Sequence, residues 1–315
     1  MRPMRFFDRR PALAGIAGAL CIAFSAIFVR LADVSVSTAA VFRCVYALPL
    51  LWLLARAERR TYGARAWRDR RPALIAGLFF AADLTFWHIS IEFVGAGLAT
   101  VLGNTQVLFV ALTAWLLLRE KPHLGAFVAI PVVLIGVVLI SGVLGEGAYG
   151  EDPVLGVVFG VLTGIAYTGF LLVLRHGNED IRRPAEPLFD ASLVGAAGSA
   201  LAGMFMGDLD LVPSWPAHGW LLALGVTSQV VGWLLISISL PRLPAAMTSI
   251  ILTLQPVGSM VLGVVLLSED PSAFQVAGVV VILVGISVAR LGHEHDEDPV
   301  VVAPGRPAEA SEGLR

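Results

Sequence analysis

Long apolar stretches separated by short polar connections run along almost the whole chain. A membrane-spanning helix needs about 20 consecutive apolar residues. From residue 291 onward the sequence becomes acidic and then rich in Pro, Ala and Gly, which predicts a disordered tail over 291–315. We therefore expect an all-α integral membrane protein with ten transmembrane helices. The expected spans are 11–30, 36–55, 72–92, 95–117, 124–142, 154–175, 187–206, 218–239, 245–267 and 273–290.

The composition supports burial in lipid rather than in a water-soluble core. Hydrophobic residues make up 57% of the 315 residues, charged residues only 15%, and the mean hydropathy is +0.81. Soluble domains average about 45–50% apolar and about 25% charged residues. The surplus of apolar surface predicts contact with membrane lipids. The net charge of −2 predicts no nucleic-acid partner.

The placement of charges predicts the orientation. If the segment 1–10 is cytoplasmic and ten spans follow, 20 of the 22 Lys and Arg residues fall on the cytoplasmic side, and acidic residues dominate the outer loops. The first apolar run, 11–29, exceeds the 7–15 residues of a signal-peptide core, so we expect a retained span. Both termini are then cytoplasmic, in the plasma (inner) membrane of the cell.

The chain contains an internal repeat. Residues 97–140 align without a gap with residues 246–289, at an offset of 149. The matched positions include Gln106 with Gln255, Glu120 with Glu269, and Pro122 with Pro271. Each repeat comprises five spans, over 11–142 and 154–290, and an odd number of spans makes the second copy enter from the opposite side. Inverted repeats are typical of alternating-access transporters, whose site lies near the membrane midplane between the copies.

These features resemble a known family. Ten spans in a five-plus-five inverted repeat, with a span ending LLLREKP and its counterpart ending LLLSEDP, resemble the EamA-type transporters of the drug/metabolite transporter superfamily. The resemblance covers about 12–290. It implies export or exchange of small organic solutes such as amino acids and related metabolites. It also implies prolines in the fourth and ninth spans; Pro256 is present, but Val107 occupies the matching position, so a break in the fourth span stays open.

Two charged residues lie deep within expected spans. Counting the helical rise, Arg43 lies roughly 10 Å and Asp83 roughly 13 Å from the outer ends of their spans. Buried ions are costly in a membrane, and an Arg–Asp pair would relieve much of that cost. The pair could recognise a charged solute, or Asp83 could carry a proton during transport. A static pair joining the second and third spans is the alternative.

Several amides and aromatic rings reach a similar depth. Amides can bind zwitterionic or neutral polar solutes without a fixed charge, although hydrogen bonding between helices explains each of them as well. The aromatic residues could form walls of a solute site or simply pack in the core. With the charged pair, the substrate-binding candidates are Arg43, Asp83, Trp87, Asn104, Gln106, Tyr167, Gln229, Trp233 and Gln255.

Few residues of the sequence support a metal site or direct use of ATP. His88 and Glu92 share a helix face, but no third metal ligand lies at useful spacing, so we expect neither a metal nor another cofactor. No Gly-x4-Gly-Lys loop is present, which argues against direct use of ATP. Gly156, Gly160 and Gly164 form a ridge for helix packing or, alternatively, for a homodimer. The leading hypothesis is a secondary transporter; an intramembrane enzyme and a passive facilitator or channel are the alternatives.

Overall fold

The computed structural model describes residues 10–118, 124–141, 144, 148–177, 180, 182–239 and 245–294. Every regular element in these ranges is helical. The expected N-terminal segment and the tail therefore lie almost entirely outside the described residues. The elements are α2 (Pro11–Ala23), α3 (Ser25–Ala32), α4 (Val36–Tyr62), α5 (Trp67–Gly103), α6 (Gln106–Leu118), α7 (Leu124–Ile140), α8 (Pro153–Gly177), α9 (Ala185–Met206), α10 (Ala217–Ala223), the π-helix η1 (Leu224–Gly232), α11 (Trp233–Ser239), α12 (Ala245–Leu267) and α13 (Ala273–Glu294).

Six helical stretches within the described residues are long and apolar enough to cross a membrane. They are Pro11–Ala32, Val36–Tyr62, Trp67–Gly103, Pro153–Leu174, Ala185–Met206 and Ala217–Ser239. Three further apolar helices are shorter, at Val128–Ile140, Leu254–Leu267 and Ala273–Val288. The chain is thus a multi-pass helical protein, and the count of ten crossings stays a prediction.

The third and fourth expected spans meet inside α5. This helix runs for 37 residues, but Gly95 has a left-handed φ of 82° and interrupts its helical geometry. A glycine tolerates that conformation because it has no Cβ. The interruption lies within the Val94–Gly97 turn at which the sequence pattern divides the two spans. The second part of α5 then continues toward α6.

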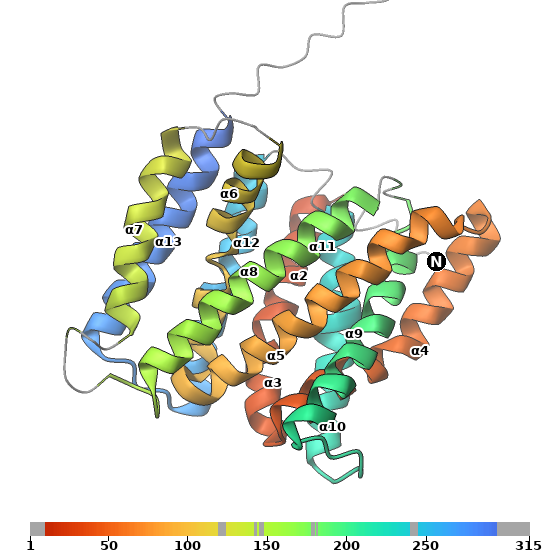
Figure 1. The fold of residues 1–315 in the computed structure, drawn as a ribbon, viewed down its shortest axis with the longest axis horizontal. Helices are drawn as coiled ribbons and strands as arrows, with labels where there is room; N and C mark the ends of the chain where they lie inside the picture. The colour runs from red at the N-terminus through yellow and green to blue at the C-terminus, as the bar shows by residue number, and fades with distance from the viewer. Residues whose placement is uncertain are drawn as a thin grey trace, which may run out of the picture.

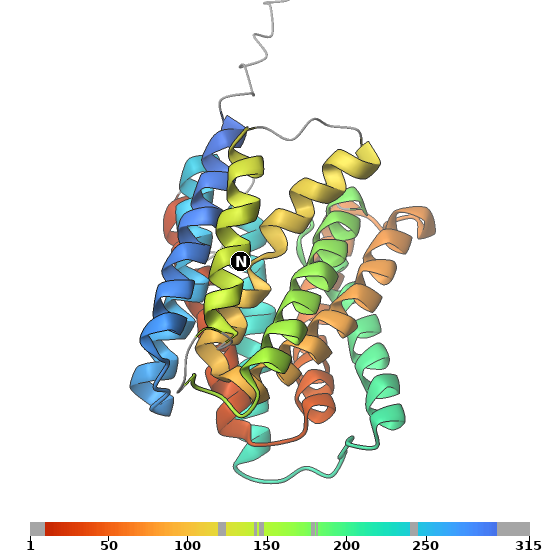
Figure 2. The same ribbon diagram turned by 60° about the vertical axis from the view of Figure 1, so that its left-hand side comes forward.

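The helices pack as neighbouring pairs. α7 lies along α13, α5 along α8, and α4 along α9 (Figures 1 and 2). The ridge of Gly156, Gly160 and Gly164 lies on α8 against α5 and the turn that follows it. An added Cβ at Gly160 would lie 2.6 Å from the Cβ of Leu102. The ridge therefore serves close packing inside the bundle.

Large apolar side chains cover much of the outside of the bundle. Leu53, Leu116 and Val265 are more than half exposed, at 55%, 64% and 68%. Alanines such as Ala14 and Ala19 are fully buried between helices instead. Small residues let membrane helices approach closely, whereas long aliphatic residues suit lipid. This distribution agrees with the apolar surplus in the composition.

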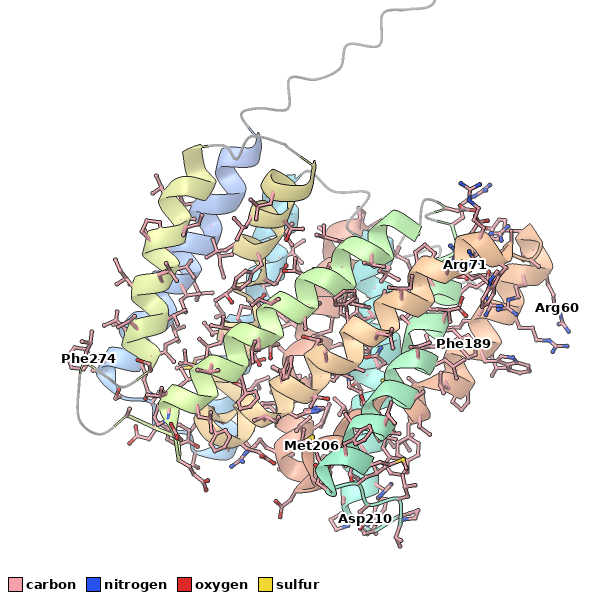
Figure 3. All side chains as sticks on the ribbon, viewed as in Figure 1. Arg60, Arg71, Phe189, Met206, Asp210 and Phe274 are labelled. Atoms are coloured by element: carbon pink, nitrogen blue, oxygen red, sulfur yellow. The ribbon has the colours of Figure 1, made fainter. Side chains whose placement is uncertain are left out.

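The two ends of the bundle differ in charge. Arg60 and Arg71 lie at one end, and Asp210 lies at the opposite end (Figure 3). The turn between α12 and α13 lies at the same end as Asp210 (Figure 1). We refer to these as the basic end and the acidic end.

Candidate functional site

A cavity of about 70 Å³ lies where α2, α3, α4, α5, α8, α11 and α12 meet. Its wall therefore contains residues from both halves of the chain. The lining residues are Ile22, Ser25, Arg43, Phe80, Asp83, Leu84, Trp87, Thr100, Gly103, Asn104, Thr163, Tyr167, Trp233 and Gln255.

The cavity brings together seven of the nine residues that the sequence singled out as substrate-binding candidates. These seven are Arg43, Asp83, Trp87, Asn104, Tyr167, Trp233 and Gln255. Gln106 and Gln229 are buried but do not line it. Depth in a span can be counted from the sequence, but the direction of a side chain around the helix axis depends on packing.

Arg43 and Asp83 share the cavity without forming the expected direct pair. Both are buried, at 4% and 8% exposure. No ion pair within 4.0 Å joins them, although the described residues contain four other ion pairs. Arg43 instead donates its Nε–H to Gln229, and its guanidinium carbon lies 5.6 Å from the ring centre of Trp87 and 5.9 Å from that of Phe80, the two rings that flank Asp83 on α5. Two opposite charges thus face one cavity separately.

Gln229 holds Arg43 from the π-helix η1. The Nε of Arg43 donates a hydrogen bond to Oε1 of Gln229 over 3.0 Å. Nε2 of Gln229 in turn donates to Oγ of Ser192 on α9, also over 3.0 Å. Gln229 and Ser192 are both 0% exposed. Gln229 therefore positions Arg43 without lining the cavity itself.

Two buried polar atoms in the cavity wall lack a hydrogen-bond partner within the described structure. They are Oγ of Ser25 and Nε1 of Trp233. Buried polar groups in folded proteins are nearly always paired. Ser25 and Trp233 thus carry a hydroxyl and an indole N–H beside the cavity that the described residues leave unpaired.

The first span is slightly irregular beside the cavity. α2 and α3 are divided at Phe24, next to the lining residue Ser25, although Phe24 keeps right-handed helical dihedral angles. Two serines from the second half of the chain bond carbonyl groups near this irregularity. Ser228 donates to the carbonyl of Cys21 over 3.0 Å, and Ser259 donates to that of Ala23 over 2.8 Å. These tertiary contacts are not revealed by the local sequence.

A break separates α5 from α6, in the expected fourth span. Nδ2 of Asn104 donates to the carbonyl of Thr100 over 2.8 Å, and Thr105 bonds a carbonyl three residues before it. Such side chains compete with the helical ladder. The fourth span thus breaks although Val107 replaces the proline of the repeat, whereas α12 continues through Pro256. Irregular backbone inside a membrane is tolerated where it lines a cavity.

Sequence reasoning did not single out seven of the lining residues. Thr100 and Thr163 donate their hydroxyl hydrogens to carbonyls four residues earlier, over 2.8 and 2.9 Å, so their oxygens can still accept from a solute. Hydroxyl residues are too common in membrane helices to stand out as a signal. The others are Ile22, Ser25, Phe80, Leu84 and Gly103.

His88 and Glu92 differ in environment although they lie one helical turn apart. His88 is 1% exposed and neither ring nitrogen has a partner in the described structure, whereas Glu92 is exposed. Within the described residues, no group of three or more His, Cys, Asp or Glu side chains could hold a metal ion.

At the acidic end, Glu269 joins the two halves of the chain. Its carboxylate accepts hydrogen bonds from the backbone N–H groups of Ala96 and Gly97, over 2.5 and 3.1 Å. These groups begin the part of α5 that follows the interruption at Gly95. Burial raises the pKa of the Glu269 carboxyl, and the two backbone hydrogen bonds act in the opposite direction.

A second contact lies close to this one. Gln275 on α13 accepts from the backbone N–H of Tyr149 over 2.8 Å, and its Nε2 donates to the carbonyl of Tyr149 over 2.9 Å. Tyr149 belongs to the connection between α7 and α8. The acidic end of the bundle is therefore tied together by buried hydrogen bonds.

Comparison with known proteins places this architecture among transporters. The model of the EamA-like transporter family matches residues 9–142 and again residues 154–291. An uncharacterized transporter of Synechocystis, sll1319, is 33% identical over 141 residues, which span 39% of this chain and 41% of that protein. The chain thus aligns with less than half the length of this relative.

Two further proteins are similar over more of their length. An uncharacterized transporter of Archaeoglobus fulgidus is 24% identical over 228 residues, covering 70% of this chain and 78% of that protein. One protein crystal structure matches with a TM-score of 0.58 and 19% identity, covering 92% of this chain and 99% of the other, and shows likeness of fold alone. Because the family model matches two successive segments that together cover most of the sequence, the chain belongs to the EamA-like transporter family of the drug/metabolite transporter superfamily and is a multi-pass membrane transporter.

Proposed function

We propose that this transporter moves a small zwitterionic solute, an amino acid or a related metabolite, by alternating access, and that it works as an exporter or exchanger. The observation that carries the proposal is the placement of Arg43 and Asp83 in the wall of one cavity, with no ion pair within 4.0 Å between them. A buried charge is costly unless it is paired, so each can gain from a solute group of opposite sign. Arg43 would bind the carboxylate and Asp83 the ammonium group.

The remaining wall suits such a solute. Asn104 and Gln255 supply amide groups, while Trp233 and Ser25 supply the unpaired donors described above. The cavity volume of about 70 Å³ favours a small solute.

The position of the cavity favours alternating access. It lies between the segments matched twice by one family model, as expected for a site between inverted repeats. The hydrogen bonds of Glu269 and Gln275 support a conformation whose acidic end is closed. Transport would require these contacts to break as one half rocks against the other.

The orientation follows from the charge distribution. We propose ten crossings in the plasma (inner) membrane, with the basic end, and both termini, in the cytoplasm. The opposite locations of Arg60 and Asp210 support this arrangement (Figure 3), because cytoplasmic loops are enriched in Lys and Arg.

The test is transport by the purified protein in proteoliposomes. A panel contains alanine, alaninamide, which lacks the carboxylate, and lactate, which has a hydroxyl in place of the ammonium group and matches alanine in size. We expect transport of the zwitterion and little of either analogue. Equal transport of all three would contradict the roles of Arg43 and Asp83, and failure to move any amino acid or metabolite, while lipid or peptide turned over, would contradict the proposed function.

Two further experiments in the same proteoliposomes address the transport mechanism. A pH gradient across the vesicle membrane tests for proton coupling through faster accumulation. Unlabelled solute on the opposite side tests for exchange through acceleration of labelled efflux. Flux that responds to neither and does not saturate would favour a passive channel.

A further inference from the structure

Four of the seven arginines between residues 56 and 71 fall into two groups by their contacts. Arg59 pairs with Glu186 over 2.8 Å, and Arg70 pairs with both carboxylate oxygens of Asp190, over 2.6 and 2.9 Å. Glu186 and Asp190 lie on α9 and are 1% and 0% exposed. These two arginines therefore hold α4 and α5 against α9.

Arg56 and Arg60 have a different environment. Both are exposed, and among the described residues neither has an ion-pair partner. Arg60 projects from the outside of the bundle (Figure 3). The two arginines line an open groove of about 440 Å³ on α4, whose lining residues are Trp52, Leu53, Arg56, Ala57, Arg60 and Thr61.

The groove combines a cationic part with an apolar part. Trp52, Arg56 and Arg60 are spaced by four residues, so they form one row of about 12 Å along the helix. The guanidinium carbon of Arg56 lies 5.2 Å from the ring centre of Trp52, which restrains its position. Trp52 and Leu53, at the other end of the row from Arg60, are 44% and 55% exposed. A tryptophan beside arginines is typical of the membrane–water interface.

We propose that this groove is a binding site for one anionic phospholipid. Arg56 and Arg60 bind the headgroup phosphate, because a guanidinium presents a planar fork of N–H groups that matches phosphate oxygens. An acyl chain lies along Trp52 and Leu53. The apolar half of the groove favours a lipid over a soluble phosphate, which would leave these two side chains without a partner.

Native mass spectrometry of the purified full-length protein tests the proposal. The protein is titrated with phosphatidylglycerol and, separately, with phosphatidylcholine. Each basic residue near an anionic headgroup strengthens binding about fivefold. We therefore expect R56Q/R60Q to bind phosphatidylglycerol about 25-fold more weakly, and binding of phosphatidylcholine, whose ammonium group offsets the phosphate charge, to change much less. The matched control is R68Q/R71Q, which removes two exposed arginines outside the groove and should retain binding.

Three results would overturn the site. Unchanged phosphatidylglycerol binding by R56Q/R60Q would remove the arginines from recognition, and an equal loss in R68Q/R71Q would indicate diffuse attraction by the basic end. Displacement of phosphatidylglycerol by equimolar glycerol 3-phosphate would indicate a soluble-anion site. Thermal unfolding in detergent, expected to be unchanged in both double variants, separates lost binding from lost folding.

Discussion

Gln229 accepts a hydrogen bond from Nε of Arg43 over 3.0 Å, across the boundary between the two halves of the chain. The cationic group of the cavity is thus oriented by a residue that never contacts the cavity itself. Because Gln229 is also anchored to Ser192, the guanidinium has a defined direction before a solute arrives. Such preorganisation reduces the cost of binding.

The first prediction concerns this support. Gln229→Leu leaves the Nε of Arg43 without its acceptor, which costs about 1–3 kcal/mol for a buried donor. We expect the KM for the zwitterion to rise about tenfold, with a smaller rise for Ser192→Ala. Transport kinetics in proteoliposomes measure the KM. A fall in thermal stability with an unchanged KM would assign Gln229 a purely structural role.

The second prediction concerns the buried carboxylate. Asp83→Asn removes the charge with little change in shape, and a charged hydrogen bond contributes about 1.5–3 kcal/mol. Transport of alanine should fall about 10- to 100-fold at low concentration. The control is Asp69→Asn, an exposed position on the same helix. Unchanged transport with lower thermal stability would leave Asp83 as a structural group.

The third prediction concerns closure of the acidic end. Glu269→Ala removes the acceptor of the Ala96 and Gly97 N–H groups, at a cost of about 1–3 kcal/mol. Hydrogen exchange of the backbone amides of Ala96 and Gly97 should accelerate, because the contact that closes the acidic end is weakened. Asp270→Ala changes the exposed neighbouring carboxylate and should leave exchange unaltered. Equal protection in both variants would disprove the role of Glu269 in closure.

The fourth prediction is a pH dependence with a defined sign. Burial raises the pKa of Glu269, so the folded protein binds this proton more tightly than the unfolded chain does. The stabilisation that the raised pKa contributes is fully present below the ordinary glutamate pKa of about 4.3. It is lost as the pH rises through the raised pKa of the folded protein. The melting temperature of the wild type relative to Glu269→Ala should therefore increase on acidification. A difference in melting temperature that is constant with pH, or that shrinks on acidification, would contradict a raised pKa of Glu269.

The fifth prediction concerns the seam between α5 and α8. Gly160→Ala places a methyl group 2.6 Å from Cβ of Leu102, and overpacking typically costs about 1–3 kcal/mol. Thermal unfolding in detergent should occur at a lower temperature. Ile165→Ala alters a lipid-exposed residue on the same helix and should have little effect. Equal stability of Gly160→Ala and the wild type would mean that the seam can open without cost.

The two charged residues of the cavity show which features of the site can be predicted from the sequence. Arg43 and Asp83 stand out because ions inside apolar runs are rare, and the rise of a helix places them at similar depths. The absence of a direct ion pair between them could not be predicted from their depth. It depends on Gln229, which comes from the second half of the chain, and on how α4 packs against the rings of Phe80 and Trp87 that flank Asp83 on α5.

Gln106 and Gln229 show why the remaining site residues resist prediction. Counting residues gives their depth, but Gln106 follows the break at Asn104 and Gln229 lies within a π-helix. Each irregularity rotates the residues after it relative to a regular α-helix. Their side chains therefore point away from the cavity that the regular pattern predicts.

The sequence by itself determined that this chain belongs in a membrane, that its last spans in each half repeat one another, and which rare polar residues lie deep. Hydropathy, spacing and charge are properties of short segments, so they can be read locally. Only the tertiary structure decided that Glu269 reaches Ala96, that Arg59 forms an ion pair with Glu186, and that Arg56 and Arg60 form none with any described residue. Those outcomes depend on how helices far apart in the chain rotate and pack, because the same side chain is paired, buried or free according to its neighbour.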